Sequence, residues 1–151
     1  MMEALNVAAI LVAGLMVGSE LAIAAFVHPT FDRLPDDVHL PAASALARVL
    51  GTVMPFWYIL VFLLTSAEVV IQWHQSGRVP IWIAISAVLW LLASLYSVIA
   101  LVPINNRIKS NPPADWKTYR RRWDRLHRWR VVLLMTALTF LIVGSCIPMK
   151  M

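Results

Sequence analysis

Residues 79–102 have the sequence VPIWIAISAVLWLLASLYSVIALV, without a single charged side chain. A transmembrane helix requires about 20 consecutive, mostly apolar residues, and this stretch meets that requirement. Three other stretches meet it as well. We therefore predict one integral membrane domain, residues 1–151, which is all-α and forms a bundle of four transmembrane helices. The expected spans are residues 4–27, 53–73, 79–102 and 131–148.

The composition of the chain agrees with a membrane protein. Of its 151 residues, 60% are hydrophobic and 14% are charged, and the mean hydropathy is +0.73. A soluble domain is typically about 45–50% apolar and about 25% charged. The net charge of +5 would also fit a nucleic-acid-binding protein, but in a membrane protein this excess belongs to basic loops. We expect the lipid bilayer as a partner and no nucleic acid.

The basic residues predict the orientation of the bundle. Eleven of the 13 Lys and Arg residues lie in segments 28–52 and 103–130, which four spans place on the same side of the membrane. The other side has only Arg78 and Lys150. Because cytoplasmic loops carry the excess of Lys and Arg, we expect a multi-pass protein of the plasma (inner) membrane. Loops 28–52 and 103–130 would be cytoplasmic, and both termini would lie outside.

Prolines and a capping residue predict the helix boundaries. His28-Pro29 and Pro103 should end the first and third helices, because the residue before a proline is disfavoured in the helical conformation. Asp115 is a suitable N-cap. The helix that it starts at Trp116 should continue into the fourth span, as an amphipathic cytoplasmic extension of that span.

This extension carries the strongest candidate site. One arc of it, less than about 90° wide, contains Trp116, Tyr119, Trp123, His127 and Arg130. The opposite face contains Lys117, Arg121, Arg125 and Arg128. Anchoring at the bilayer surface explains tryptophans and arginines, but not a histidine and an arginine on the aromatic face. Two hypotheses stay open: an interfacial helix alone, or a helix whose His127 and Arg130 point into the mouth of the bundle.

A carboxylate inside the first span is the second candidate. An ionisable group at the depth of Glu20 is costly unless it is paired, protonated or hydrated. We expect Glu20 to face inward and to bond a polar neighbour, with Arg130 the most suitable cation. His28 lies eight residues later, about 80° around the helix, so it can face the same bundle. Asn105 and Asn106 would place two amides at the same mouth.

Three other features are given roles outside the site. Glu68 should meet water or a basic group near the outer end of the second span. His39 should be solvated in the first cytoplasmic loop. Gly14 and Gly18 form a GxxxG motif, which is typical of a helix-packing surface.

Cofactors are only partly constrained. Glu20, His28 and His127 could converge, and two histidines with a carboxylate suit iron or copper. No HxxxH or ExxH spacing supports such a site, so metal binding stays open and no metal ligand is assigned. The single cysteine, Cys146, excludes a cysteine-based zinc or iron–sulfur site. No glycine-rich nucleotide motif is present, so no organic cofactor is predicted.

The spacing of the polar residues resembles that of a known family. The segments that carry the resemblance are Gly18-Ser19-Glu20 with His28-Pro29, Met54-Pro55-Phe56-Trp57, Pro103-Ile104-Asn105, and Trp116 through Trp123 and His127 to Arg130. They are similar to the anthrone oxygenase-like family of small four-helix membrane proteins, over nearly the whole chain. Characterised members oxidise anthrones to anthraquinones, and the resemblance implies O₂ as co-substrate. Its motif positions correspond to Asn105, Trp123, His127 and Arg130, whereas Glu20 and His28 match a narrower subset.

We therefore expect a membrane-embedded oxidoreductase, an oxygenase acting on a hydrophobic, phenolic or polycyclic, anthrone-like small molecule. Catalytic roles are assigned to His127, as the base, and to Arg130, Asn105, Glu20 and His28. Substrate binding is assigned to Trp123, Asn106, Trp116 and Tyr119. The alternatives are a non-catalytic accessory or assembly protein, and a small-molecule binding or transport protein. A homo-oligomer is left open.

Overall fold

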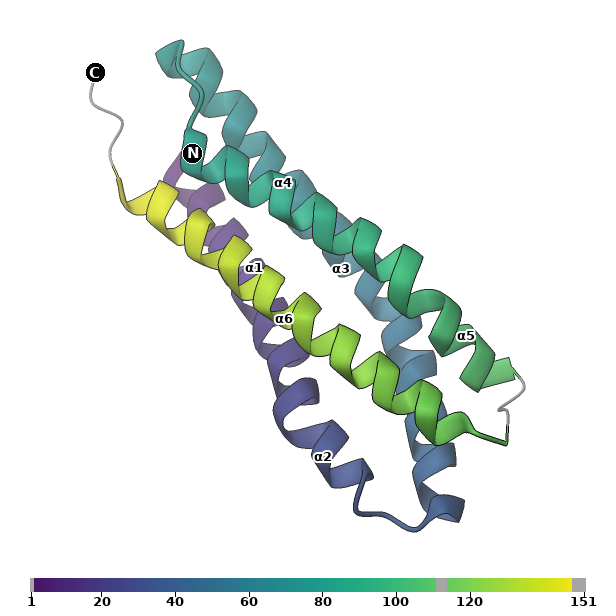
Figure 1. Cartoon of the computed structure of the whole chain (residues 1–151). Helices are drawn as coiled ribbons and strands as arrows, with labels where there is room; N and C mark the ends of the chain where they lie inside the picture. The colour runs from purple at the N-terminus through teal and green to yellow at the C-terminus, as the bar shows by residue number, and fades with distance from the viewer. Residues whose placement is uncertain (1, 111–113, 148–151) are drawn as a thin grey trace.

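A computed structural model of the chain describes residues 2–110 and 114–147, which form four long helical rods (Figure 1). The first rod consists of α1 (Met2–Ala22), the π-helical turn η1 (Ile23–Val27) and α2 (His28–Phe31). The second is α3 (Asp36–Ser76). The third consists of α4 (Ile81–Tyr96), the π-helical turn η2 (Ser97–Leu101) and α5 (Val102–Ser110). The fourth is α6 (Trp116–Cys146).

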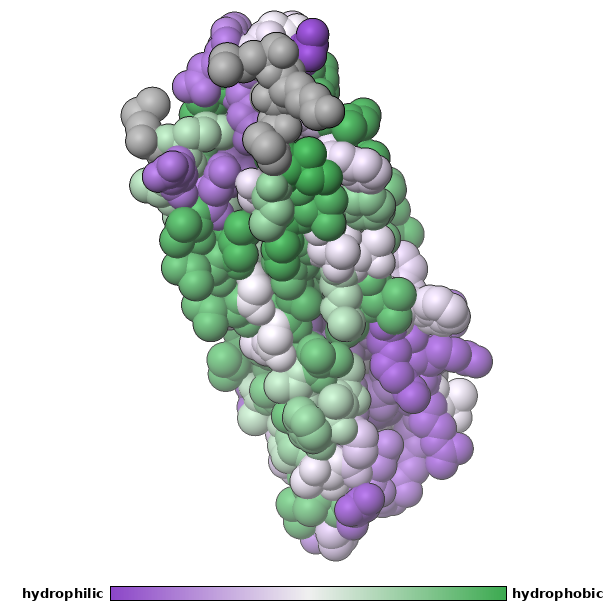
Figure 2. Space-filling model, turned by 90° about the vertical axis from the view of Figure 1, so that its left-hand side faces the viewer, coloured by the Kyte–Doolittle hydropathy of each residue, from purple (hydrophilic) through white to green (hydrophobic). Residues whose placement is uncertain are grey.

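All four rods are long and apolar enough to cross a membrane, and the described residues contain no strand. The prediction of an all-α, four-helix membrane bundle is therefore confirmed. Large apolar side chains such as Phe26, Phe56 and Ile99 point outward, as expected where lipid is the solvent. Figure 2 shows hydrophobic residues over the middle of the molecule and hydrophilic residues gathered toward its ends.

The rods form a closed ring in which each packs against two others. α1 packs against α3 and α6, and α4 packs against the same two helices. The start of α1, the end of α6 and the connection from α3 to α4 lie at one end of the bundle, while α2 and α5 lie at the other (Figure 1). The centre is filled by side chains from all four rods, including Ala13, Met16, Val61, Trp90, Leu134 and Ala137.

Two prolines do not end their helices, contrary to prediction. The first rod continues through His28-Pro29 to Phe31, and the third continues through Pro103 to Ser110. In each case a five-residue π-turn comes directly before the residue that precedes the proline, which is His28 or Val102. The backbone N–H of that residue bonds to the carbonyl five residues back. A proline ring clashes with the carbonyl four residues back in an α-helix. The wider π-turn relieves this clash, because it changes the spacing of those carbonyls.

Segment 28–52 is not an extended loop. α3 begins at Asp36 and includes Pro41 and Pro55 within 41 helical residues. At about 1.5 Å per residue it is about 60 Å long, twice the hydrocarbon thickness of about 30 Å, so it extends well beyond the membrane. The prediction that α6 starts at Trp116 and continues without a break into the fourth span is confirmed, although the side chain of Asp115 makes no capping hydrogen bond.

Of the three features expected outside the site, Glu68 and His39 differ from prediction. Glu68 is fully buried, and neither of its carboxyl oxygens has a hydrogen-bond partner. His39 is buried beside Trp116, at a ring separation of 5.0 Å. The GxxxG face has no partner within this bundle, because a Cβ at Gly14 or Gly18 would meet nothing within 4 Å. Helix α3 extends further than expected, so His39 lies on a helix instead of in a loop.

Candidate active site

A cavity of about 290 Å³ lies between the halves of the four rods nearest α2 and α5. Most of its wall is apolar, and α3 contributes the largest share of the lining residues, including Leu46, Leu50 and Met54. The first rod and α6 contribute the carboxylate, guanidinium and imidazole groups of the wall, from Glu20, His28, Arg120, His127 and Arg130, together with Trp123. Tyr58 of α3 and Ser97 and Asn105 of the third rod add further polar groups. The cavity thus combines a hydrophobic slot with one charged side, which is the usual form of a small-molecule site.

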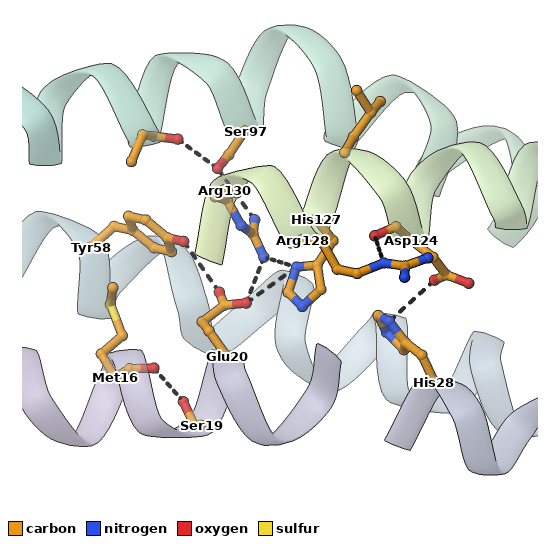
Figure 3. Close-up of polar contacts among 12 residues, drawn as sticks. Met16, Ser19, Glu20, His28, Tyr58, Ser97, Asp124, His127, Arg128 and Arg130 are labelled. Atoms are coloured by element: carbon orange, nitrogen blue, oxygen red, sulfur yellow. Dashed lines mark hydrogen bonds and ion pairs between the residues drawn. The ribbon is translucent and has the colours of Figure 1, made fainter. Parts of the chain in front are cut away.

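Glu20 is the centre of a buried hydrogen-bond network (Figure 3). Its Oε2 accepts a hydrogen bond from Nη2 of Arg130 at 2.6 Å, and its Oε1 accepts one from the hydroxyl of Tyr58 at 3.2 Å. Nη1 of Arg130 donates to Oγ of Ser97 at 3.2 Å. The predictions that Glu20 faces inward and that Arg130 is its cation are confirmed. The pair satisfies the condition under which a charge is tolerated at this depth.

His127 is held by the same arginine. It is fully buried, and its Nδ1 lies 2.9 Å from Nη2 of Arg130 and 3.4 Å from Oε2 of Glu20. A guanidinium has only donors, so the shorter contact assigns the lone pair to Nδ1 and the proton to Nε2. The Nε2 atom is buried without a partner. Trp123 stacks on the imidazole at 4.8 Å, with 15° between the rings.

His28 has the opposite environment. Its Nδ1 lies 3.1 Å from the carboxylate oxygen Oδ1 of Asp124, an ion-pair contact without hydrogen-bond geometry, and its Nε2 is buried without a partner. A neighbouring carboxylate favours the proton on Nδ1, which leaves the lone pair on Nε2. The ring is 5.1 Å from both His127 and Trp123. Two buried imidazoles therefore lie side by side, one presenting an N–H and the other a lone pair.

The π-turns bring these residues to one face. In a regular α-helix, eight residues separate two side chains by about 80°, and this is the spacing from Glu20 to His28. A π-turn acts as a one-residue insertion, which shifts the later residue back by about 100° and leaves only about 20° between them. Ser97 and Asn105 have the same spacing across η2, and both line the cavity.

Comparison with known families gives an identification that agrees with this geometry. The family model described as anthrone oxygenase matches residues 43–140. The chain belongs to the anthrone oxygenase family. No curated protein and no solved structure matches the chain. Asn105, Trp123, His127 and Arg130 lie within the matched region, whereas Glu20 and His28 precede it.

The cavity contains most, but not all, of the residues predicted for the site. Glu20, His28, Asn105, Trp123, His127 and Arg130 line it. Asn106, Trp116 and Tyr119 do not. Asn106 is exposed, Trp116 packs on His39, and the ring of Tyr119 lies 4.7 Å from the guanidinium of Arg107.

Four residues at or beside the cavity were not predicted from the sequence. Tyr58 and Ser97 bond to the Glu20–Arg130 pair, and Arg120 and Asp124 are buried beside His28. The available signal was Asp124, the only acid in a strongly basic run. It lies one helical turn after Arg120 and one turn before His127, so the three share a face of α6.

The donor set does not favour a three-ligand metal site. Within residues 2–110 and 114–147, no group of three or more His, Cys, Asp or Glu side chains could hold a metal ion. Both carboxylate oxygens of Glu20 already accept hydrogen bonds, from Arg130 and Tyr58. The hypothesis that Glu20, His28 and His127 jointly bind iron or copper gains no support from this arrangement, and no residue is assigned as a metal ligand.

Proposed function

We propose that this member of the anthrone oxygenase family is a membrane oxygenase that oxidises an anthrone-like phenolic or polycyclic compound with O₂. The observation that most supports this proposal is the pair of buried histidines on the wall of an apolar cavity. Each has Nδ1 next to a charged group and Nε2 unpartnered. Such a pair offers a proton acceptor and a hydrogen-bond donor to one substrate.

His28 is the proposed base. An anthrone has an acidic methylene group between two aromatic rings, and its carbanion is delocalised onto the carbonyl oxygen. The Nε2 lone pair of His28 removes the proton, and Asp124 stabilises the resulting imidazolium. This assignment differs from the expectation that His127 is the base, because Arg130 occupies the Nδ1 lone pair of His127.

His127 is the proposed donor to the developing oxyanion. Its Nε2–H is a neutral hydrogen-bond donor in a dry site, where such a donor is worth more than in water. The Nη atoms of Arg130 are not free for this role, because they already contact Glu20, His127 and Ser97. Arg130 therefore acts by fixing the tautomer and the position of the His127 ring.

The reaction balances without another reductant. The substrate carbanion transfers electrons to O₂, and a C–O bond forms to give a hydroperoxide at the former methylene carbon. Removal of the remaining proton from that carbon breaks the O–O bond and yields the ketone and hydroxide, which takes up a proton to become water. One O₂ thus converts one anthrone into one anthraquinone and one water.

Access and orientation follow from the position of the cavity. Its apolar wall suits a substrate that partitions into the bilayer. The cavity lies toward the end of the bundle that carries most of the Lys and Arg residues. By the positive-inside rule, we propose that this end faces the cytoplasm and that both termini face the outside of the plasma membrane.

The test is O₂ consumption by purified protein in lipid nanodiscs supplied with an anthrone. We expect O₂ uptake and quinone absorbance to rise together, in a ratio of one to one. The His28→Ala/His127→Ala double variant, inserted and folded, is the matched control. Wild-type protein that is no faster than this variant, across several anthrones, would refute the proposed chemistry.

A further inference from the structure

Arg120 is a buried arginine whose hydrogen-bonding capacity is largely unused. It lines the cavity, it is only 6% exposed, and its Nε and Nη2 atoms are buried without a hydrogen-bond partner. Its guanidinium lies over the ring of Trp123, 4.9 Å from the ring centre. A buried N–H group without an acceptor lowers the stability of the fold. An acceptor that enters from the cavity would remove this cost for both donors.

The neighbouring carboxylate does not fill this role. Oδ1 of Asp124 lies 3.3 Å from Nε of Arg120, close enough for electrostatic attraction, but the N–H group does not form a hydrogen bond. The same oxygen lies 3.1 Å from Nδ1 of His28. Arg130 is different, since its Nη atoms bond to Glu20 and Ser97. Of the two cavity arginines, Arg120 has two unpartnered nitrogen donors, Nε and Nη2, whereas in Arg130 only Nε is without a partner.

The two free donors define the chemistry of the acceptor. Nε–H and the adjacent Nη2–H point in parallel from one edge of the guanidinium, and this edge matches the two oxygens of a carboxylate. A phenolate oxygen would use only one of these donors.

We propose that the substrate is an aromatic acid whose carboxylate binds the Nε–Nη2 edge of Arg120. The inference rests on the proposed function, because it places the rings of that substrate in the apolar part of the same cavity, next to His28 and His127. Arg120 lies four residues after the start of α6, in the basic extension that precedes the fourth span. The acid group therefore stays near the membrane surface while the rings enter the apolar slot.

Binding of two matched product-type compounds tests this proposal without turnover. The probes are anthraquinone-2-carboxylate and its neutral carboxamide, and the readout is quenching of tryptophan fluorescence in nanodiscs. We expect Arg120→Gln to weaken binding of the carboxylate by about 10- to 100-fold, the range for losing charge-assisted hydrogen bonds, and to leave the carboxamide almost unchanged. Arg120→Lys keeps the charge but loses the paired donors, so it should restore only part of the affinity.

Two controls separate a specific loss from misfolding. Arg122→Gln removes an exposed arginine of the same helix and should leave both affinities unchanged. Arg120→Gln/Asp124→Asn removes both charges of the pair, and it should bind the carboxamide like the wild type. Equal affinities of the wild type for the two probes, unaffected by Arg120→Gln, would overturn the role of Arg120 alone. Absence of binding by both probes would overturn the proposed function as well.

Discussion

At the residue scale, the proposed roles of the two histidines predict different effects of replacing each by glutamine. Glutamine has an amide N–H but cannot act as a base. His127→Gln should therefore retain a donor and lose less than about tenfold in kcat, whereas His28→Gln should lose about 10²–10⁴. Initial rates of O₂ uptake with an anthrone measure both. If His127→Gln proved the more damaging change, His127 would be the base and the tautomers assigned here would be reversed.

The Glu20–Arg130 pair gives a prediction about stability. Removing one partner of a buried ion pair leaves an uncompensated charge and costs about 3–5 kcal/mol. Glu20→Leu and Arg130→Leu should each lower the free energy of unfolding by this order, measured by denaturant titration in mixed micelles. The double variant should lose clearly less than the sum of the two. Additive losses would mean that the pair, at 2.6 Å, contributes no coupling.

The sequence allowed the Glu20–Arg130 contact to be predicted because a lone acid inside an apolar helix requires a cation. Arg120 and Asp124 could not be found in the same way. They lie in a charged run in which most neighbours are exposed, and only the packing of α6 against the first rod buries them. Tyr58 was missed because an aromatic side chain in an apolar span faces lipid as readily as the core.

At the element scale, the contact between α4 and α6 depends on a glycine. A Cβ at Gly144 would lie 2.5 Å from Cγ1 of Ile83 and 3.0 Å from its backbone nitrogen. Gly144→Ala should force the two helices apart and lower the free energy of unfolding by about 1–3 kcal/mol, the usual cost of overpacking. Gly18→Ala is the matched control, since a Cβ at Gly18 meets nothing within 4 Å. Equal melting temperatures for the two variants would contradict this packing.

Element boundaries were only partly predictable. The amphipathic pattern correctly joined the extension at Trp116 to the fourth span, because periodicity is a local property of the sequence. The prolines were misleading, since a helix that widens by one residue can include them. Whether the helix widens in this way depends on the hydrogen bonds and packing of the whole rod. A residue pair such as His28-Pro29 does not contain that information.

At the scale of the whole molecule, the orientation can be tested directly. Reporter fusions at Gly77, between α3 and α4, should be active outside the membrane, and fusions at Asp36, at the start of α3, should be active in the cytoplasm. The asymmetry of Lys and Arg is the physical reason. The reverse result would place the cavity at the outer face, where a substrate would arrive from outside the cell.

The four spans were predictable because hydropathy is set by the residues of each span alone. The cavity was not, because it depends on how the rods rotate relative to one another. Six of the predicted site residues line it nevertheless. Glu20 stood out as a polar residue inside an apolar span, and Trp123, His127 and Arg130 stood out because they share the aromatic arc of the extension.

The π-turn between Glu20 and His28 also has a consequence for chain length. A protein with the same bundle and a regular α-helix here would need one residue fewer between the acid and the histidine to keep both on one face. A seven-residue interval would place them about 20° apart, close to the arrangement that this chain reaches with eight. Deleting one alanine from η1 should therefore keep Glu20 and His28 on one face, at the cost of the clash at Pro29 that the π-turn relieves, whereas inserting one should turn His28 away from the cavity. The number of residues between the two, easily counted in any sequence, thus becomes a marker of helix geometry.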